Sequence, residues 1–236
     1  MVYIVIILLI ISVLTLISFG KKAKIYNLRK EYSYCYKLVL TDAKKANGRL
    51  EKTIEKCKEY KNREYICKFA VLKLYTDIDC RKDVESTIQL LNIEDLFCKN
   101  GKYSASKAIL NMDSLYFMSV VMLKANKYKL NNVIDYLWKH VNKYCNYLEE
   151  NVEFCLFKAI YSSVTDKDDK GKAFYNEILM NGDVNDNNDN KTMEIYQNTA
   201  LLMKKYLCIE LSNEEKNKVN EFSKTLLGKI VSSNLW

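Results

Sequence analysis

The chain has 236 residues, with 37 Lys and Arg against 29 Asp and Glu and a formal net charge of +8. It contains six glycines and no proline, and stretches of alternating apolar residues are absent after residue 20. Because proline is the residue that breaks helices, and alternation is the pattern of half-buried strands, this composition predicts an all-α protein and argues against sheet-based folds.

The opening segment Val2–Phe19 has 18 residues without a charged side chain. As an α-helix it would be about 27 Å long, enough to cross the hydrocarbon core of a bilayer. Met1–Tyr3 supplies no basic start, and Ser18-Phe19-Gly20 matches a signal-peptide cleavage site poorly. Residues 1–20 are therefore predicted to be an uncleaved transmembrane helix.

Basic residues follow the apolar segment directly, and none precedes it. Positive charge beside a span stays in the cytoplasm, so we expect the N-terminus outside and the C-terminal domain in the cytoplasm. Residues 21–63 carry 14 Lys and Arg and 5 Asp and Glu, whereas residues 64–236 carry 23 and 24. Residues 21–63 are thus predicted to be a basic juxtamembrane region that contacts anionic lipid, or a solvated helix whose charges only fix topology. The predicted membrane-surface residues are Lys21, Lys22, Lys24, Arg29 and Lys30.

Residues 64–236 are predicted to be a domain of repeat-like helical hairpins, and the chain reads as successive helices from residue 25 onward. Residues 104–125 are apolar on several sides, which predicts a central buried helix. We expect a first helix to continue to residue 46 and stop at Asn47-Gly48, Asp79 to cap a helix that follows it, Lys99-Asn100-Gly101 to form a turn, and Ser212 with Glu215 to form a capping box. Short links favour antiparallel helix pairs. The predicted helices are 25–46, 49–60, 64–75, one after residue 79, 104–125, 131–141, 147–164, 170–180, 192–209 and 214–231.

Three of these pairs share a pattern of small and aromatic residues. Phe157–Tyr161 is followed by Lys172–Leu179, Lys124–Tyr128 by Val133–Lys139, and Asn198–Tyr206 by Val219–Phe222. Over Met112 to Leu227 this pattern resembles tetratricopeptide repeats. The resemblance implies a short α-solenoid in which Ala173 lets two helices approach closely, with a concave face that holds a peptide or partner helix. The repeat spacing here is 40 and 46 residues, against about 34 in that family, so an irregular helical bundle is the alternative.

One polar loop has the oxygen spacing of an EF-hand calcium site. Acid or amide oxygens stand at its first, third and fifth positions, and a glutamate stands at its twelfth. The turn glycine of that motif is replaced by Asn188, and there is no second such loop. Ca²⁺ is therefore a minor hypothesis beside a disordered loop, and no other cofactor is expected. The candidate ligands are Asp183, Asn185, Asn187, Asp189 and Glu194.

Residues that could carry catalysis are sparse. His140 is the only histidine, and Cys145 follows it at a spacing that does not share a helix face. The glycines are isolated, so no phosphate-binding loop is indicated, and no zinc or nucleic-acid-binding motif occurs. The sequence predicts a protein that is not an enzyme and does not bind nucleic acid.

Two functional hypotheses remain open. In the first, a membrane-anchored cytoplasmic scaffold or adaptor binds another protein or peptide at the membrane face, and its eight cysteines are reduced thiols. In the second, a type II surface or virion ectodomain pairs those cysteines in four disulfides and carries a glycan on Asn190-Lys-Thr192. A calcium-responsive adaptor is a lesser alternative.

Overall fold

The computed structural model describes the backbone of residues 2–165, 175–176, 178–179 and 190–235. Side chains are described in the same ranges, except those of residues 2–18, 21 and 190–192. The described chain is almost entirely helical, as the sequence predicts. Its helices are α1 (Val2–Thr41), α2 (Ala43–Glu59), α3 (Arg63–Cys80), α4 (Glu85–Ile88), α5 (Glu94–Phe97), α6 (Ala105–Ile109), α7 (Met112–Lys127), α8 (Asn131–Val141), the 3₁₀ turn η1 (Asn142–Tyr144), α9 (Cys145–Leu148), α10 (Val152–Val164), α12 (Asn190–Tyr206), α13 (Asn213–Lys224) and α14 (Leu226–Leu235).

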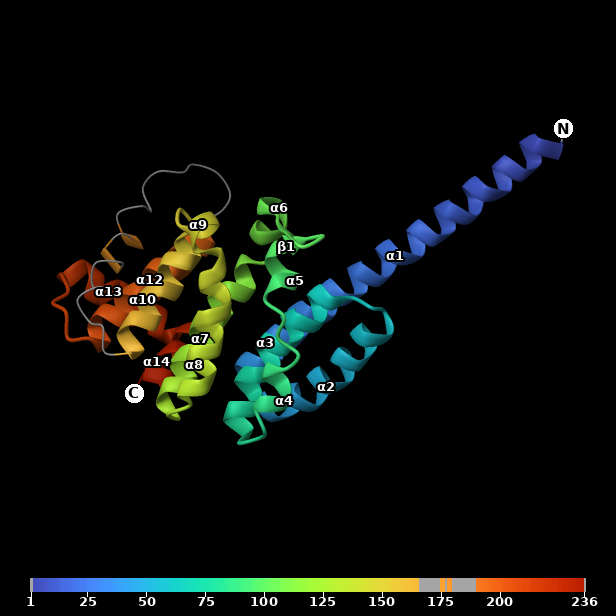
Figure 1. Cartoon of the computed structure of the whole chain (residues 1–236). Helices are drawn as coiled ribbons and strands as arrows, with labels where there is room; N and C mark the ends of the chain where they lie inside the picture. Colours follow the sequence, from blue (N-terminus) through green and yellow to red (C-terminus); the bar gives the residue numbers. More distant parts are fainter. Residues whose placement is uncertain (1, 166–174, 177, 180–189, 236) are drawn as a thin grey trace.

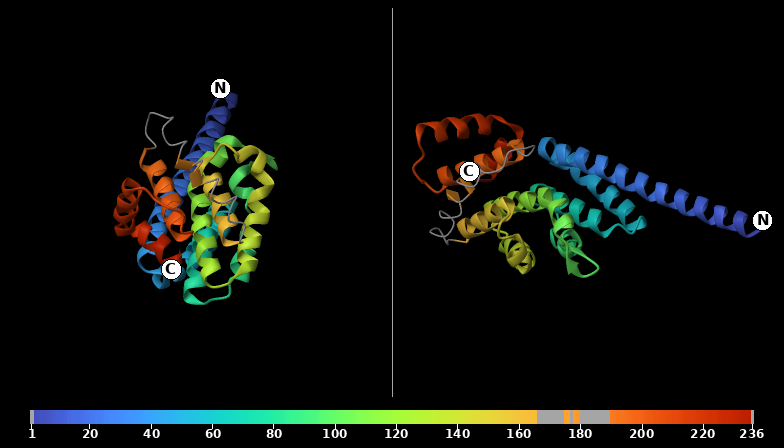
Figure 2. Two further views of the ribbon diagram at one scale, coloured as in Figure 1. Left: turned by 90° about the vertical axis from the view of Figure 1, so that its left-hand side faces the viewer. Right: turned by 90° about the horizontal axis from the view of Figure 1, so that it is seen from above.

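Helix α1 is a single rod of 40 residues whose N-terminal half projects beyond the rest of the molecule (Figure 1, Figure 2). It runs without a break through residue 20, the predicted end of the anchor. In its second half Leu28, Tyr32, Cys35 and Val39 are buried. These positions are spaced by four, three and four residues, so they share one face of the helix. That face packs on α2, α3 and α14, which makes the C-terminal half of α1 part of the body.

The predicted helix stop at Asn47-Gly48 is wrong. Helix α1 ends at Thr41, and Asp42 caps α2 by accepting a hydrogen bond from the Lys45 backbone nitrogen at 2.9 Å. Asn47 lies inside α2, where it is buried and donates to side chains of α3. A favourable cap earlier in the chain and a buried partner for Asn47 together outweigh its local tendency to end a helix.

Asp79 is also not the cap that the sequence predicts. It lies in the last turn of α3 and pairs with Lys124 of α7 at 2.5 Å. Helix α4 begins at Glu85, whose backbone nitrogen donates to Asp83 Oδ1 at 2.9 Å. Because the Asp79 carboxylate pairs with Lys124 across α3 and α7, it does not cap the helix that follows.

Two helices, α3 and α7, form the centre of the body. Both are buried around most of their circumference, which is typical of helices that pack on every side. Helix α7 contacts α3, α8, α10 and α14, so the prediction of a central helix here is confirmed. The predicted helix 104–125 is nonetheless two helices, because Asn111 is buried between α6 and α7 and its amide donates to the Leu96 and Lys107 carbonyls, both at 2.9 Å.

The last predicted helix, 214–231, is likewise divided. The Ser212–Glu215 capping box is present and starts α13. The chain then turns at Thr225 into α14, where Gly228 lies against α13 so closely that a Cβ on it would be 1.9 Å from the Phe222 carbonyl oxygen. Only glycine permits this approach.

Helix pairs occur at two of the places where the repeat pattern predicts them, α7 with α8 and α12 with α13. Ala173 and most of residues 170–180 lie outside the described residues. In a solenoid each repeat contacts only its neighbours, whereas here α14 returns to contact both α7 and α1. This contact pattern favours the irregular helical bundle.

A small hairpin is the one addition to the helical pattern within the described residues. Strands β1 (Cys98–Lys99) and β2 (Lys102–Tyr103) pair antiparallel around Asn100-Gly101. Both turn residues have positive φ, 53° and 74°, as a two-residue hairpin turn requires. The predicted turn is confirmed.

Across the part of the chain that the structure describes, none of the helices combines the length and the apolar character that a membrane span needs. The predicted span, Val2–Phe19, lies outside the residues whose side chains are described, apart from Phe19 itself.

Candidate interaction surface

The face of α1 opposite its buried stripe is basic and exposed. Lys22, Arg29 and Lys30 are exposed away from α2. Lys24 is exposed on the side that faces α2, with its Nζ 4.8 Å from the Tyr60 ring centroid, and the side chain of Lys21 lies outside the described residues. Some of these cations lie over tyrosine rings: Lys30 Nζ is 4.6 Å from the ring centroid of Tyr26. Such contacts hold a long cationic side chain in place while its charge stays accessible.

A shallow depression of about 400 Å³ follows this face. No acidic side chain lines it, so its potential is positive and suits acidic groups. The guanidinium carbon of Arg49, from α2, lies 4.4 Å from the ring centroid of Tyr34 at the edge of this depression. The lining residues are Tyr26, Arg29, Lys30, Ser33, Tyr34 and Lys37.

A deeper groove of about 570 Å³ lies on the other side of the same residues, between α1, α3 and the start of α7. Arg29, Ser33 and Lys37 line both hollows, so they form one continuous surface along α1. The other lining residues are mostly aromatic or apolar: Ile25, Tyr32, Tyr36, Asn62, Glu64, Tyr65, Lys68, Leu110 and Asp113.

The wall of this groove contains a buried hydroxyl and a buried ammonium group. Tyr32 is 7% exposed, its hydroxyl oxygen has no hydrogen-bond partner of normal geometry, and burial raises its pKa well above the usual value. Lys68 Nζ lies 5.0 Å from the Tyr32 ring centroid and 5.8 Å from that of Tyr65. It also donates to the Leu110 carbonyl at 3.3 Å and lies 3.5 Å from Asp113. The groove thus combines aromatic surface with charged side chains of both signs.

An ion pair between Arg49 of α2 and Glu31 of α1 holds α1 against α2. Arg49 of α2 donates through Nε and Nη2 to the two carboxylate oxygens of Glu31, at 2.5 and 2.9 Å. Hydrogen bonding to Arg49 lowers the pKa of Glu31, against the opposing effect of burial. A two-point contact between guanidinium and carboxylate fixes direction as well as distance, so the basic face is oriented away from α2.

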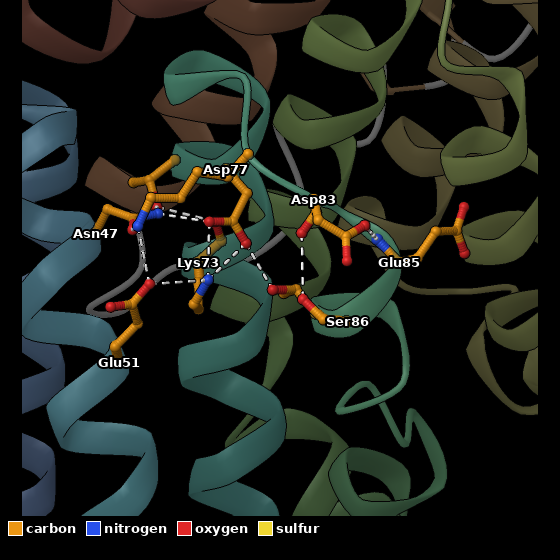
Figure 3. Close-up of polar contacts among 10 residues, drawn as sticks. Asn47, Glu51, Lys73, Asp77, Asp83, Glu85 and Ser86 are labelled. Carbon is orange, nitrogen blue, oxygen red and sulfur yellow. Dashed lines mark hydrogen bonds and ion pairs between the residues drawn. The ribbon is translucent and has the colours of Figure 1, made fainter.

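The densest polar cluster lies elsewhere, between α2, α3 and α4 (Figure 3). Asp77 is fully buried, and its carboxylate accepts from Asn47 Nδ2 at 2.6 Å, from Lys73 Nζ at 2.8 Å and from Thr87 Oγ1 at 2.6 Å. At the edge of the cluster, Glu51 lies 3.7 Å from Lys73 Nζ. Because the carboxylate is enclosed and already bonded by three side chains, it has no approach for a substrate. The geometry supports a structural crosslink between three helices.

The calcium hypothesis is not decided by the described residues. Asp183, Asn185, Asn187 and Asp189 lie outside them, and Glu194 lies within α12. Among the residues that are described, no three His, Cys, Asp or Glu side chains are placed to hold a metal ion.

His140 and Cys145 take separate partners. His140 Nδ1 lies 2.8 Å from the Tyr136 carbonyl oxygen, and its ring stacks on Tyr136 at 4.1 Å. The Cys145 thiol donates to Asn146 Oδ1 at 3.3 Å. A nucleophile paired with this histidine as its base is therefore not what the geometry supports.

All eight cysteines lie in the described part of the chain, and no disulfide joins any of them. Five are buried, and Cys208 alone of the eight is exposed. Burial raises the pKa of Cys35 and of Cys57 to about 12, which keeps both in the unreactive thiol form.

No protein-family model, no curated protein and no solved structure matches this chain.

Proposed function

We propose that this protein is a single-pass membrane scaffold that binds another protein at the cytoplasmic face and catalyses no reaction. The 18-residue apolar stretch Val2–Phe19 supports the anchor, and the basic residues that follow it support a cytoplasmic body. The observation that carries the proposal is α1 itself. One unbroken helix joins the apolar stretch to the body and displays there a basic, aromatic surface with a groove beside it.

The partner that fits this surface is an acidic segment with apolar or aromatic side chains. Arg29 and Lys37 stand between the positive depression and the aromatic groove, so a helix or extended peptide laid along α1 would meet both. Lys37 is 18 residues after Phe19, about 27 Å along the helix. That distance is well beyond the Debye length of about 8 Å. On a helix that stands upright in the membrane, Lys37 is therefore too far from the lipid headgroups to interact with their charge.

Topology is the first property to test. Cys208 is exposed, so a membrane-impermeant maleimide should label it in permeabilised cells and leave it unlabelled in intact cells. A Cys208→Ser variant gives the background from the other thiols. Labelling of intact cells would contradict the proposed topology, and absence of labelling even after permeabilisation would favour the disulfide-bonded ectodomain.

Partner binding is tested by crosslinking from the proposed surface in living cells. A photoreactive residue in place of Ser33, which lines both hollows, should give a discrete crosslinked product that Arg29→Glu removes. Lys229→Glu, at an exposed position on α14, is the matched charge reversal and should leave the product unchanged. An equal loss in both variants, or a product unaffected by Arg29→Glu, would refute binding at α1.

A further inference from the structure

The β1–β2 hairpin and α6 form a projection, residues 98–110, at the end of the body from which α1 departs (Figure 1). In the left view of Figure 2 this projection is again at the end where α1 rises towards the N-terminus. Helix α6 is held there by its contacts with α5 and β1. The projection is therefore fixed relative to the outgoing helix.

Two adjacent large aliphatic side chains are exposed on this projection. Ile109 is 67% exposed and Leu110 is 63% exposed. For comparison, Leu226 on α14 is 45% exposed. Single exposed apolar residues are ordinary, whereas Ile109 at the end of α6 and Leu110 directly after it form a small continuous apolar patch.

All charged side chains of the projection are basic. Residues 98–110 contain Lys99, Lys102 and Lys107 and no acidic residue. Lys99 and Lys102 are exposed at either side of the hairpin turn, while Lys107 donates to the Cys98 carbonyl at 3.0 Å. An apolar pair beside exposed lysines is the combination that binds the headgroup region of an anionic leaflet.

The height of the projection along α1 sets the tilt that this contact requires. The Leu110 carbonyl accepts from Lys68 Nζ, which lies 5.0 Å from the Tyr32 ring centroid, and Tyr32 is 13 residues beyond Phe19, about 20 Å along the helix axis. The headgroup layer on each side of a bilayer is roughly 5–8 Å thick, and spanning helices tilt by up to about 40°. The contact therefore requires a strong tilt of α1 towards α6, which lowers the aliphatic pair towards the headgroups.

We propose that Ile109 and Leu110, with Lys99 and Lys102, form a second membrane contact on an anionic leaflet. This inference rests on the proposed anchor. With two contacts, the body is held at a defined tilt and the groove beside α1 opens sideways rather than towards the bilayer.

The test uses the full chain reconstituted in vesicles of phosphatidylcholine and phosphatidylserine that contain a nitroxide-labelled lipid. A small fluorescent amino acid replaces Ile109 in one variant, Leu226 in a second as the matched exposed site, and Ile10 in a third. We expect lipid quenching at 109 and 10 but not at 226. Quenching at 109 should be lost when Lys99→Glu and Lys102→Glu are added or when phosphatidylserine is omitted.

The outcomes separate the two proposals. Quenching at 10 without quenching at 109 would leave the anchor standing and overturn the second contact. Absence of quenching at 10 would refute the anchor, and the inference with it. A fluorophore at 109 that is shielded from aqueous iodide but not quenched by lipid would show that protein, such as a second copy, covers the site, which also overturns the inference.

Discussion

Replacing Asp77 with alanine should destabilise the body more than any surface change. The substitution removes the acceptor shared by Asn47, Lys73 and Thr87 and leaves the Lys73 ammonium, whose residue is 9% exposed, without its nearest counter-charge. Breaking a buried ion pair from one side costs about 3–5 kcal/mol. Glu51, 3.7 Å from Lys73 Nζ, compensates part of this loss, so we expect the lower half of that range.

The assay is thermal unfolding of the full chain in detergent micelles, followed by far-UV circular dichroism. For a chain of this size each kcal/mol lowers Tm by about 2–4 °C, so Asp77→Ala should lower it by roughly 6–16 °C. Asp135→Ala, at an exposed acid on α8, is the control and should change Tm by less than about 2 °C.

A second variant tests the reason for the loss. Asp77→Leu combined with Lys73→Met removes both charges, and a buried pair replaced in this way is often neutral or stabilising. Asn47 and Thr87 still lose their acceptor, so the double variant should recover part of the lost Tm. The reasoning is refuted if Asp77→Ala has the same Tm as Asp135→Ala, or if the double variant is no more stable than Asp77→Ala.

Three further predictions concern other parts of the body. Gly48→Ala, in open space within α2, should stabilise the protein by about 0.5–1 kcal/mol. Gly228→Ala should destabilise it, because its Cβ would meet the backbone of the preceding helix. Denaturant unfolding of both variants measures the two changes in the free energy of unfolding. The pKa of Glu31 is lowered from 4.5 in the folded protein, so its contribution to stability is present above pH 4.5 and lost as pH falls through the lowered value. The Tm difference between Glu31→Gln and the parent should therefore shrink as pH falls below 4.5. With a thiol reagent at neutral pH, Cys208 should react first and Cys35 only on unfolding; mass spectrometry of partly labelled protein identifies the order.

The helical character of the chain could be predicted from the sequence, because apolar spacing and the absence of proline are local signals. Several helix ends could not be predicted, for a specific reason. With only six glycines, four helices are followed within one or two residues by a non-glycine residue in the left-handed region: Lys61, Arg81, Lys129 and Cys208. A lysine or arginine that adopts the left-handed conformation cannot be recognised from the sequence, so the helices were expected to end at Asn and Gly instead.

Only part of the candidate surface could be predicted from the sequence. The basic residues after Phe19 are evident, and the stripe formed by Leu28, Tyr32 and Cys35 follows a helical period that would have shown which face of α1 is buried. The groove was not visible, because Lys68 and Asp113 join it from α3 and α7, far along the chain. The Asp77 cluster was missed for the same reason, since its members come from three helices.

The continuity of α1 has a mechanical consequence. A straight α-helix resists twisting, so the N-terminal half and the body keep a fixed rotational phase about the helix axis. One residue inserted between Gly20 and Lys24 would turn the body by about 100° and advance it by about 1.5 Å. Successive insertions would therefore present each side of the body in turn to whatever lies beside α1. After about 18 inserted residues, five full turns of the helix, the body would regain its original orientation but would lie about 27 Å further along the axis.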